Sequence, residues 1–417
     1  MSVETIQTLI VGGGQAGLAL SAHLGQRGLP HLVLERARIA ERWRSERWDS
    51  LVANGPAWHD RFPTLRFDDL APDSFAPRDR IVQYFESFAD QINAPIRCGV
   101  AVSAVTRAAD GSFHVETSDG TLQARNLVAA TGPFQRPLIP TAIPETAGLV
   151  QMHSSAYRNP GQLPDGAVLV VGAGSSGAQI ADELLRAGRQ VFLSVGPHDR
   201  PPRAYRGHDF CWWLGALGQW DAKTRAPGME HVTIAVSGAD GGQTVDFRRL
   251  AARGMVLLGR AGAFADGVLQ VAPDLAQNLA RGDANYLSVL DKADAYVAQH
   301  GLTLPEEPAA RVIGPDPDCV KSPRLSLNLA AEGIGAVIWA TGYTLDFGWL
   351  QVDGFDALGR PQHHRGVADL PGLYFLGLPW LSRRASPFIW GVWQDAAHLA
   401  AHIADRGQGC ATRPMGR

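Results

Sequence analysis

The same strand–turn–helix–strand pattern occurs twice in this chain, at residues 5–35 and 167–195. Each copy has an apolar run, a Gly-x-Gly-x-x-Gly motif, an amphipathic stretch that ends in glycine, and a second apolar run. Glycines at these positions allow a tight turn out of the strand, bring backbone N–H groups close to a pyrophosphate, and let the helix pack closely on the strand. One such motif could be an ordinary glycine-rich turn, but two copies in the same context predict two dinucleotide-binding units.

The two copies differ at the end of the second strand, where the adenosine ribose is recognised. The first copy ends in a carboxylate, which suits ribose hydroxyls without a 2′-phosphate, as in FAD or NAD. The second copy has a serine near that place and arginines shortly after it. Because arginine pairs with a 2′-phosphate, we expect FAD in the first unit and NADPH in the second, with NADH as the alternative cofactor and a solvated loop as the alternative role for the arginines. The candidate contacts at these strand ends are Glu35, Arg36, Ser194, Arg200 and Arg203.

The chain is therefore expected to have an α/β fold with two Rossmann-like domains, one inserted in the other. We place the FAD-binding domain at residues 1–155 and 322–417 and the NADPH-binding domain at 160–321. The junctions are taken from Pro/Gly-rich stretches at 158–166 and 313–323. The candidate contacts within the two glycine motifs are Gly12, Gly14, Gln15, Ala16 and Gly17, and Gly172, Gly174, Ser175, Ser176 and Gly177.

Two Ala-Thr-Gly motifs, which end in Thr131–Gly132 and Thr341–Gly342, each close an apolar strand. Together with the two glycine motifs, they make nearly the whole chain resemble the class B flavin-dependent monooxygenases, in particular the bacterial and plant-type members. The resemblance implies that the Ala-Thr-Gly motifs contact the cofactors where the chain passes between the domains. It also implies an NADPH-dependent enzyme that forms a C4a-(hydro)peroxyflavin and oxygenates a small organic substrate at nitrogen, sulfur or a related centre.

Three further segments carry the resemblance, at residues 42–48, 48–54 and 373–403. The first resembles the family stretch that lines FAD, and the third resembles the final strand, flavin-side loop and closing helix. The second resembles the stretch with an active-site asparagine beside the flavin, which falls on Asn54. An Asn-Gly turn is the alternative reading of Asn54. The residues that these matches assign to the cofactor are Trp43, Arg44, Trp390 and Gly391.

Two histidines are candidates for a role near the site. His59 follows Asn54 closely and could move a proton, with a hydrogen-bonded turn histidine as the alternative. His153 matches the histidine of the family pattern F-x-G-x-x-x-H, but Ala147 and Leu149 replace its Phe and Gly. We therefore expect His153 to link the domains, and we do not expect a typical Baeyer–Villiger enzyme.

Composition limits the competing functions. The four cysteines include no Cys-x-x-Cys pair, which argues against a disulfide reductase and against a metal site. A net charge of −3 without a basic stripe argues against nucleic acid as a partner. The remaining alternative is an NADPH-dependent flavin reductase or oxidase that passes electrons to a quinone, a protein or O2.

The expected partners are a small-molecule substrate and O2. No stretch approaches ~18 consecutive apolar residues and no signal peptide is evident, so we expect no membrane association and a cytoplasmic location. The segment at 208–220 is unusually aromatic, and three roles are open for it: covering the cleft, a dimer contact, or a buried helix. A homodimer is the assembly that we keep open.

Overall fold

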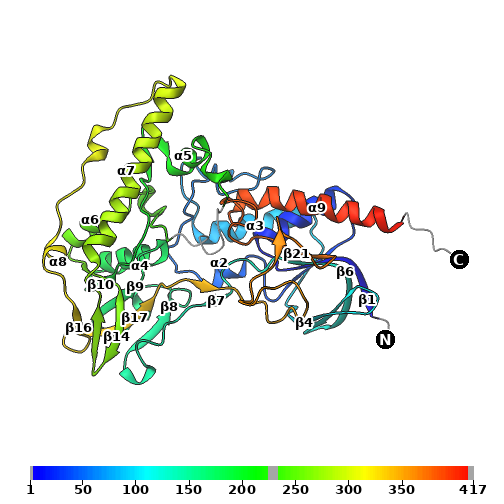
Figure 1. The fold of residues 1–417 in the computed structure, drawn as a ribbon, viewed down its shortest axis with the longest axis horizontal. Coiled ribbons are helices and arrows are strands. Elements are labelled where there is room, and N and C mark those ends of the chain that lie inside the picture. Colours follow the sequence, from blue (N-terminus) through cyan, green and yellow to red (C-terminus); the bar gives the residue numbers. More distant parts are fainter. Residues whose placement is uncertain (1–2, 224–232, 412–417) are drawn as a thin grey trace.

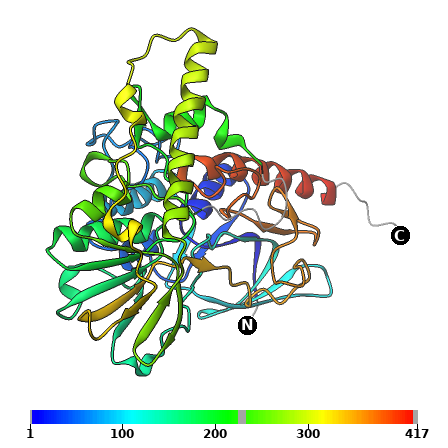
Figure 2. The same cartoon turned by 60° about the vertical axis from the view of Figure 1, so that its left-hand side comes forward.

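The computed structural model describes residues 3–223 and 233–411, and this part of the chain has the predicted α/β fold. Figure 1 shows two lobes, one around β1 and β6 and the other around β9 and β10. Helix α7 rises from the second lobe, and Figure 2 shows that it extends past the sheets. Among the described helices, none has both the length and the apolar character needed to cross a membrane.

The first lobe is built on a nine-stranded sheet whose centre consists of parallel strands. In order across the sheet, these are β3 (Ile96–Cys98), β2 (Leu32–Glu35), β1 (Glu4–Val11), β6 (Gly120–Ala129) and β21 (Leu373–Phe375). The edges add antiparallel pairs from β4 (Val102–Arg107), β5 (Phe113–Thr117), β19 (His363–His364) and β20 (Val367–Ala368). The last four residues of β1 and the first three of β2 are buried, as expected for apolar, β-branched segments covered on both faces.

The second lobe contains a five-stranded parallel sheet. Its strands, in order, are β13 (Val256–Leu258), β10 (Val191–Ser194), β9 (Ala167–Val171), β17 (Ile334–Trp339) and β8 (Val150–His153). All five residues of β9 are buried, which explains why that segment is an uninterrupted apolar run. Antiparallel strands complete the lobe: β14 (Ala261–Ala265), β15 (Val268–Val271) and β16 (Ser326–Asn328), and the hairpin of β11 (Ala204–Tyr205) and β12 (His208–Asp209).

Helices cover both sheets. Those of the first lobe are α1 (Gln15–Gln26), α2 (Glu41–Ser45), α3 (Arg78–Gln91) and α9 (Ile389–Ala411), and α1 packs on α9. Those of the second lobe are α4 (Ser175–Arg186), α5 (Phe210–Ala216), α6 (Phe247–Ala252), α7 (Leu275–His300) and α8 (Asp318–Lys321). The aromatic segment at 208–220 contains α5, whose Trp213 is fully buried against Leu290 of α7, so this part of the segment is a buried helix.

The strand pairing shows that both lobe junctions lie outside the predicted boundaries at 155/160 and 321/322. Strand β8 precedes the first boundary and β17 follows the second, yet both pair into the second lobe's sheet. The Pro/Gly-rich stretches are therefore turns inside this lobe. The chain instead crosses just after β6 and just after β17, at the two Ala-Thr-Gly motifs, and β7 (Arg136–Pro137) pairs there with β18 (Tyr343–Thr344).

Two glycines of α1, one inside the first glycine motif and one outside it, test how that motif shapes the fold. A Cβ atom on Gly17 would lie 1.9 Å from the carbonyl oxygen of Gly12, whereas a Cβ on Gly25 would meet no atom within 4 Å. We expect Gly17→Ala to lower the free energy of unfolding by about 1–3 kcal/mol or more, because α1 must move away from β1. The matched Gly25→Ala change should raise it by about 0.5–1 kcal/mol. Denaturant titration of both variants measures the difference, and equal stabilities would contradict it.

Candidate active site

A cavity of about 570 Å³ lies beside the first glycine motif. The motif, the end of β2, α2 and the first Ala-Thr-Gly motif all contribute to its wall. Its size is that of a site for a large cofactor. Of the residues predicted to hold FAD, the structure brings the following to the cavity: Gly12, Gly14, Gln15, Ala16, Glu35, Arg36, Trp43, Thr131 and Gly132.

The glycines of this motif are required for different physical reasons. Gly12 has a φ of +117°, and a Cβ there would lie 2.5 Å from the carbonyl oxygen of Ala130. Gly17 lies behind the cavity, at the contact of α1 with β1 described above. A Cβ on Gly14 would have no atom within 4 Å, so the turn at the start of α1 is open to a pyrophosphate.

The Glu35 carboxylate is fixed at the end of β2 by backbone N–H groups. Its two oxygens accept hydrogen bonds from the N–H of Gly13 at 2.8 Å and of Ala37 at 3.0 Å. Each carboxylate oxygen can accept a further bond, so ribose hydroxyls would find acceptors here. The open turn at Gly14 and the carboxylate of Glu35 therefore fit the pyrophosphate and the adenosine ribose of FAD.

Much of the cavity wall comes from residues that were not among the predicted contacts, although some of them lie in the matched segments 42–48 and 373–403. They include Arg42, Arg47, Phe85, Phe134, Gln135, Asp346, Trp349, Gly377 and Pro387. Arg44, which was predicted as a contact, is absent from the wall: its guanidinium pairs with Glu86 and donates to the carbonyl of Ile39. Arg44 is thus directed toward α3, which contains Glu86, and away from the cavity.

The second glycine motif has the same internal packing but a covered turn. A Cβ on Gly172 would lie 2.4 Å from the carbonyl oxygen of Ala340, and one on Gly177 would lie 1.8 Å from that of Gly172. At the turn itself, a Cβ on Gly174 would lie 3.4 Å from Thr233. The chain at 233–236 thus passes over this turn, so a nucleotide would meet that segment first.

Ser175 holds the covering segment in place. Its hydroxyl donates to the carbonyl of Ile234 at 2.9 Å and accepts from the N–H of Val236 at 3.2 Å. The segment also pairs with the chain after β10, where the N–H of Ala235 donates to the carbonyl of Asp199 at 2.8 Å. Ser176, the next residue of α4, is half-buried.

The prediction that Arg200 and Arg203 bind a 2′-phosphate is wrong, because both guanidinium groups are used inside the second lobe. Both are buried, and each pairs with a carboxylate, Arg200 with Asp283 at 2.7 Å and Arg203 with Asp209 at 2.6 Å. Ser194 is buried as well, and its hydroxyl donates to a backbone carbonyl at 3.0 Å. Asp283 lies 83 residues from Arg200 and Asp209 lies six residues after Arg203, and the spacing of the arginines alone reveals neither pairing.

Arg260 is an exposed guanidinium beside the end of β10. It follows β13, which runs parallel to β10, and its Cγ lies 3.5 Å from the position of a Cβ on Gly196. Its side chain is 64% exposed, although it pairs with Asp274 at 2.6 Å. A 2′-phosphate at the end of β10 would meet Arg260, which the sequence did not indicate because it follows a different strand.

Asn54 lies where the two lobes meet. Its side-chain Oδ1 accepts a hydrogen bond from Gln179 of α4 at 2.9 Å, and its backbone carbonyl accepts one from Arg203 at 2.6 Å. The residue is exposed, and its amide N–H groups donate to no residue of the described chain. Asn54 is therefore held from behind by the second lobe while its donors remain free for a ligand.

His59 forms a buried pair with Asp60. Its Nδ1 lies 2.7 Å from Asp60 Oδ1, and the other carboxylate oxygen accepts the N–H of Gly55 at 2.9 Å. The ring stacks on Trp220, with 5.0 Å between centroids. His59 is only 6% exposed and lies in a turn, and its Nε2 has no hydrogen-bond partner among the residues described, so both readings of this histidine stay open.

Trp390 and Gly391 do not line the cavity beside β1, so their assignment to the flavin stays a prediction. The Trp390 ring packs edge-on against His59, with 5.4 Å between centroids. A Cβ on Gly391 would lie 2.0 Å from the carbonyl oxygen of Ala385, so this glycine lets α9 pack on the loop before it. Pro387 of that loop does line the cavity, and its carbonyl accepts from Gln15, which ties the loop to α1.

His153 connects the two chain crossings. Its Nε2 lies 2.9 Å from the carbonyl oxygen of Gly342, and its Nδ1 lies 3.0 Å from the hydroxyl of Ser155. Burial lowers the pKa of His153, and the bond to Gly342 opposes that shift. Thr341 donates to the carbonyl of Leu138, so the second crossing is tied to the first. Neither Thr341 nor Gly342 lines the cavity beside β1.

Known proteins resemble this chain in sequence and in fold. The sequence profile of the family described as pyridine nucleotide-disulphide oxidoreductase matches residues 9–204. The "Uncharacterized oxidoreductase CzcO-like" of Geobacillus kaustophilus is 33% identical over 402 residues, which cover 95% of this chain and 98% of that protein. Indole-3-pyruvate monooxygenase YUCCA1 of Oryza sativa is 37% identical over 192 residues, 45% of this chain and 47% of that protein. The flavin-containing monooxygenase of Stenotrophomonas maltophilia has a similar fold, with a TM-score of 0.66 at 19% identity over 97% of this chain and 100% of that one.

Variants of Arg203 and Arg260 can distinguish an arginine that stabilises the fold from one that contacts the 2′-phosphate of NADPH. We expect Arg203→Gln to lower the free energy of unfolding by about 3–5 kcal/mol, because the Asp209 carboxylate loses its buried partner. We expect Arg260→Gln, at an exposed site, to cost less than about 1 kcal/mol but to reduce the preference for NADPH over NADH. Denaturant unfolding and KM for both nucleotides measure the two effects. If the Arg203→Gln protein is stable but has lost its preference for NADPH, Arg203 contacts the 2′-phosphate as the sequence predicted.

Proposed function

This chain belongs to the class B flavin-dependent monooxygenase family, and from that premise we propose that it is an NADPH-dependent enzyme that transfers one atom of O2 to a small organic substrate. NADPH supplies two electrons, and the second oxygen atom leaves as water. The substrate is a soft nucleophile such as an amine or a sulfide, or a related centre. The observation that carries the proposal is the position of Asn54, which the second lobe holds through Gln179 and Arg203 while its amide donors stay free.

The flavin, when bound, supplies the oxygen chemistry through the reaction of its reduced ring with O2. The chain's own part is to bind, to orient and to exclude water. The open turn at Gly14 and the carboxylate of Glu35 would hold the dinucleotide, as their geometry fits it. Asn54 would orient the reacting groups by donating a hydrogen bond from Nδ2, because Gln179 already occupies its Oδ1.

His59 is the residue best placed to hold a proton. Release of one oxygen atom as water needs protons, and a histidine can carry one near neutral pH. Asp60 accepts from Nδ1 and so would direct the mobile proton to Nε2, which has no other partner in the described part of the chain. The stacked ring of Trp220 keeps this histidine away from bulk water.

The test of the proposal is stopped-flow absorbance after the anaerobic, NADPH-reduced holoenzyme is mixed with oxygenated buffer. A transient band distinct from reduced and oxidised flavin would support monooxygenase chemistry. Direct return to oxidised flavin would overturn it and would favour the reductase or oxidase alternative. In that case the search would turn to an electron acceptor.

Replacing Asn54 tests its donor role. We expect Asn54→Ala and Asn54→Asp to bind FAD normally but to shorten the life of the transient band and to release more hydrogen peroxide, since neither variant has the amide N–H. Asn54→Asp keeps the size of the side chain and so separates loss of the donor from loss of packing. Unchanged decay in both variants would remove Asn54 from the mechanism.

Replacing His59 tests proton transfer. We expect His59→Asn to leave flavin reduction by NADPH unchanged, to lower turnover by about 10²-fold, and to change the pH profile of kcat. Asp60→Asn should change the pH profile of kcat less than His59→Asn does, because Asp60 acts only by orienting the ring of His59. The control is His300→Asn, at an exposed position near the end of α7. An unaltered pH profile in His59→Asn would mean that the histidine is structural.

A further inference from the structure

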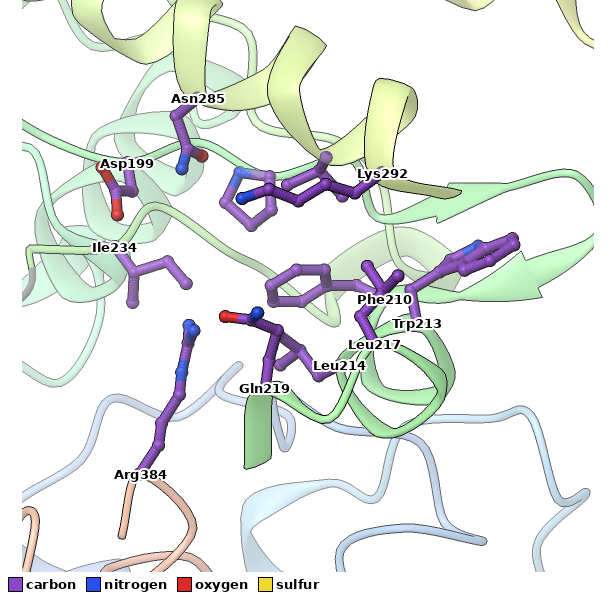
Figure 3. Close-up of a pocket in the computed structure, with 12 residues that line it drawn as sticks. Asp199, Phe210, Trp213, Leu214, Leu217, Gln219, Ile234, Asn285, Lys292 and Arg384 are labelled. Atoms are coloured by element: carbon purple, nitrogen blue, oxygen red, sulfur yellow. The ribbon is translucent and has the colours of Figure 1, made fainter. Parts of the chain in front are cut away.

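A second cavity, of about 80 Å³, is lined by residues of both lobes (Figure 3). Its walls come from α5, η3 (Gln219–Asp221) and α7, and from the loop that precedes α9. The two glycine motifs do not contribute to it. It is therefore distinct from the cavity beside β1.

Charged side chains enter this cavity from different elements. Lys292 comes from α7, Arg384 comes from the loop before α9, and Asp199 lies after β10. Figure 3 shows the Lys292 and Arg384 side chains extending toward the same space from opposite walls. Within the described chain, none of these three groups forms an ion pair. Two positive charges and one negative charge leave an excess of one positive charge.

Arg384 is the group that most needs a ligand. Burial lowers the pKa of its guanidinium, and the carboxylate of Asp199 opposes that shift without reaching ion-pair distance. A guanidinium nevertheless stays protonated in proteins, so a half-buried charge stands at the cavity without a hydrogen-bonded anion among the described residues. An anion in the cavity would supply the missing acceptors.

The other residues of the cavity wall indicate the chemistry of the rest of that anion. Phe210, Leu214 and Ile234 present apolar surface, and Gln219 and Asn285 add two polar amides. Asp199 adds negative charge at one end, which disfavours a dianion such as a phosphate monoester. The fitting ligand is a small monoanion with an apolar body.

We propose that this cavity binds the carboxylate of a small apolar organic acid, with Arg384 and Lys292 as its cationic contacts. The planar guanidinium of Arg384 pairs with a carboxylate through two parallel hydrogen bonds, and the ammonium of Lys292 adds a third donor. The inference rests on the proposed function, because it names the class of substrate for that reaction.

The anion site is joined to the candidate active site by one short segment. Gln219 lines the cavity, and the next residue, Trp220, stacks on His59 at 5.0 Å between centroids. The carbonyl of Trp220 accepts the N–H of Ala385, the residue after Arg384, at 3.1 Å. An acid anchored by Arg384 is thus held on one side of η3, with His59 on the other.

The test uses benzoate and benzamide, which share size and shape but differ in charge. Calorimetric titration of the holoenzyme should show benzoate binding at least about tenfold more tightly than benzamide. Arg384→Gln should abolish this preference, and Lys292→Gln should weaken it. The control is Arg281→Gln, an exposed residue of α7 outside the cavity, which should leave the preference unchanged. Thermal unfolding of each variant reports whether it is folded.

Three outcomes would overturn the proposal: equal affinity for the two probes, an equal loss in Arg281→Gln, or competition between benzoate and NADPH, which would assign the cations to the nucleotide. If Arg384→Gln fails to fold, the comparison of Lys292→Gln with Arg281→Gln decides. The transient flavin band is measured separately in the unmodified enzyme. Its absence would refute the monooxygenase reaction without touching the benzoate preference, so the two failures can be told apart.

Discussion

The buried guanidinium of Arg203 holds the candidate active site together. It pairs with Asp209 and donates to the backbone carbonyl of Asn54, and the same Asp209 accepts the N–H of Cys211 at the start of α5. One charge therefore fixes the first turn of α5 and the asparagine at the meeting of the lobes. A buried ion pair is costly to form, but its geometry fixes the relative position of the groups that it joins.

The fold was predictable because its decisive contacts are local. Glycine sterics within a few residues, as at Gly12 and Gly17, force the turn and the helix–strand contact, and both copies of the motif carry that information. The lobe junctions were not predictable in the same way, because proline and glycine mark turns inside a lobe as well as junctions between lobes. The pairing of β8 with β17 joins residues far apart in sequence, which no local pattern reports.

The candidate site was predictable in part for the same reason. Glu35 follows from its place at the end of β2, and the structure puts it on the cavity wall beside β1. The arginines after β10 supplied a charge but not its partner, and Asp283 and Asp209 take up both cations. The stacking of His59 on Trp220 likewise joins residues far apart in sequence, which only the folded chain brings together.

The pairing of β7 with β18 also has a mechanical consequence. Two separate linkers would let the lobes twist and slide freely, whereas two hydrogen-bonded crossings form a single ribbon. A ribbon bends easily across its flat face but resists stretching and shear, so at these crossings it would favour a swing of the lobes about one axis over a twist. Such a swing would lengthen or shorten the Gln179–Asn54 hydrogen bond while leaving Glu35 and Gly14, both in the first lobe, at a constant separation. The contacts of Glu35 and Gly14 with the adenosine end of a dinucleotide would therefore stay unchanged while the space at Asn54 opens and closes.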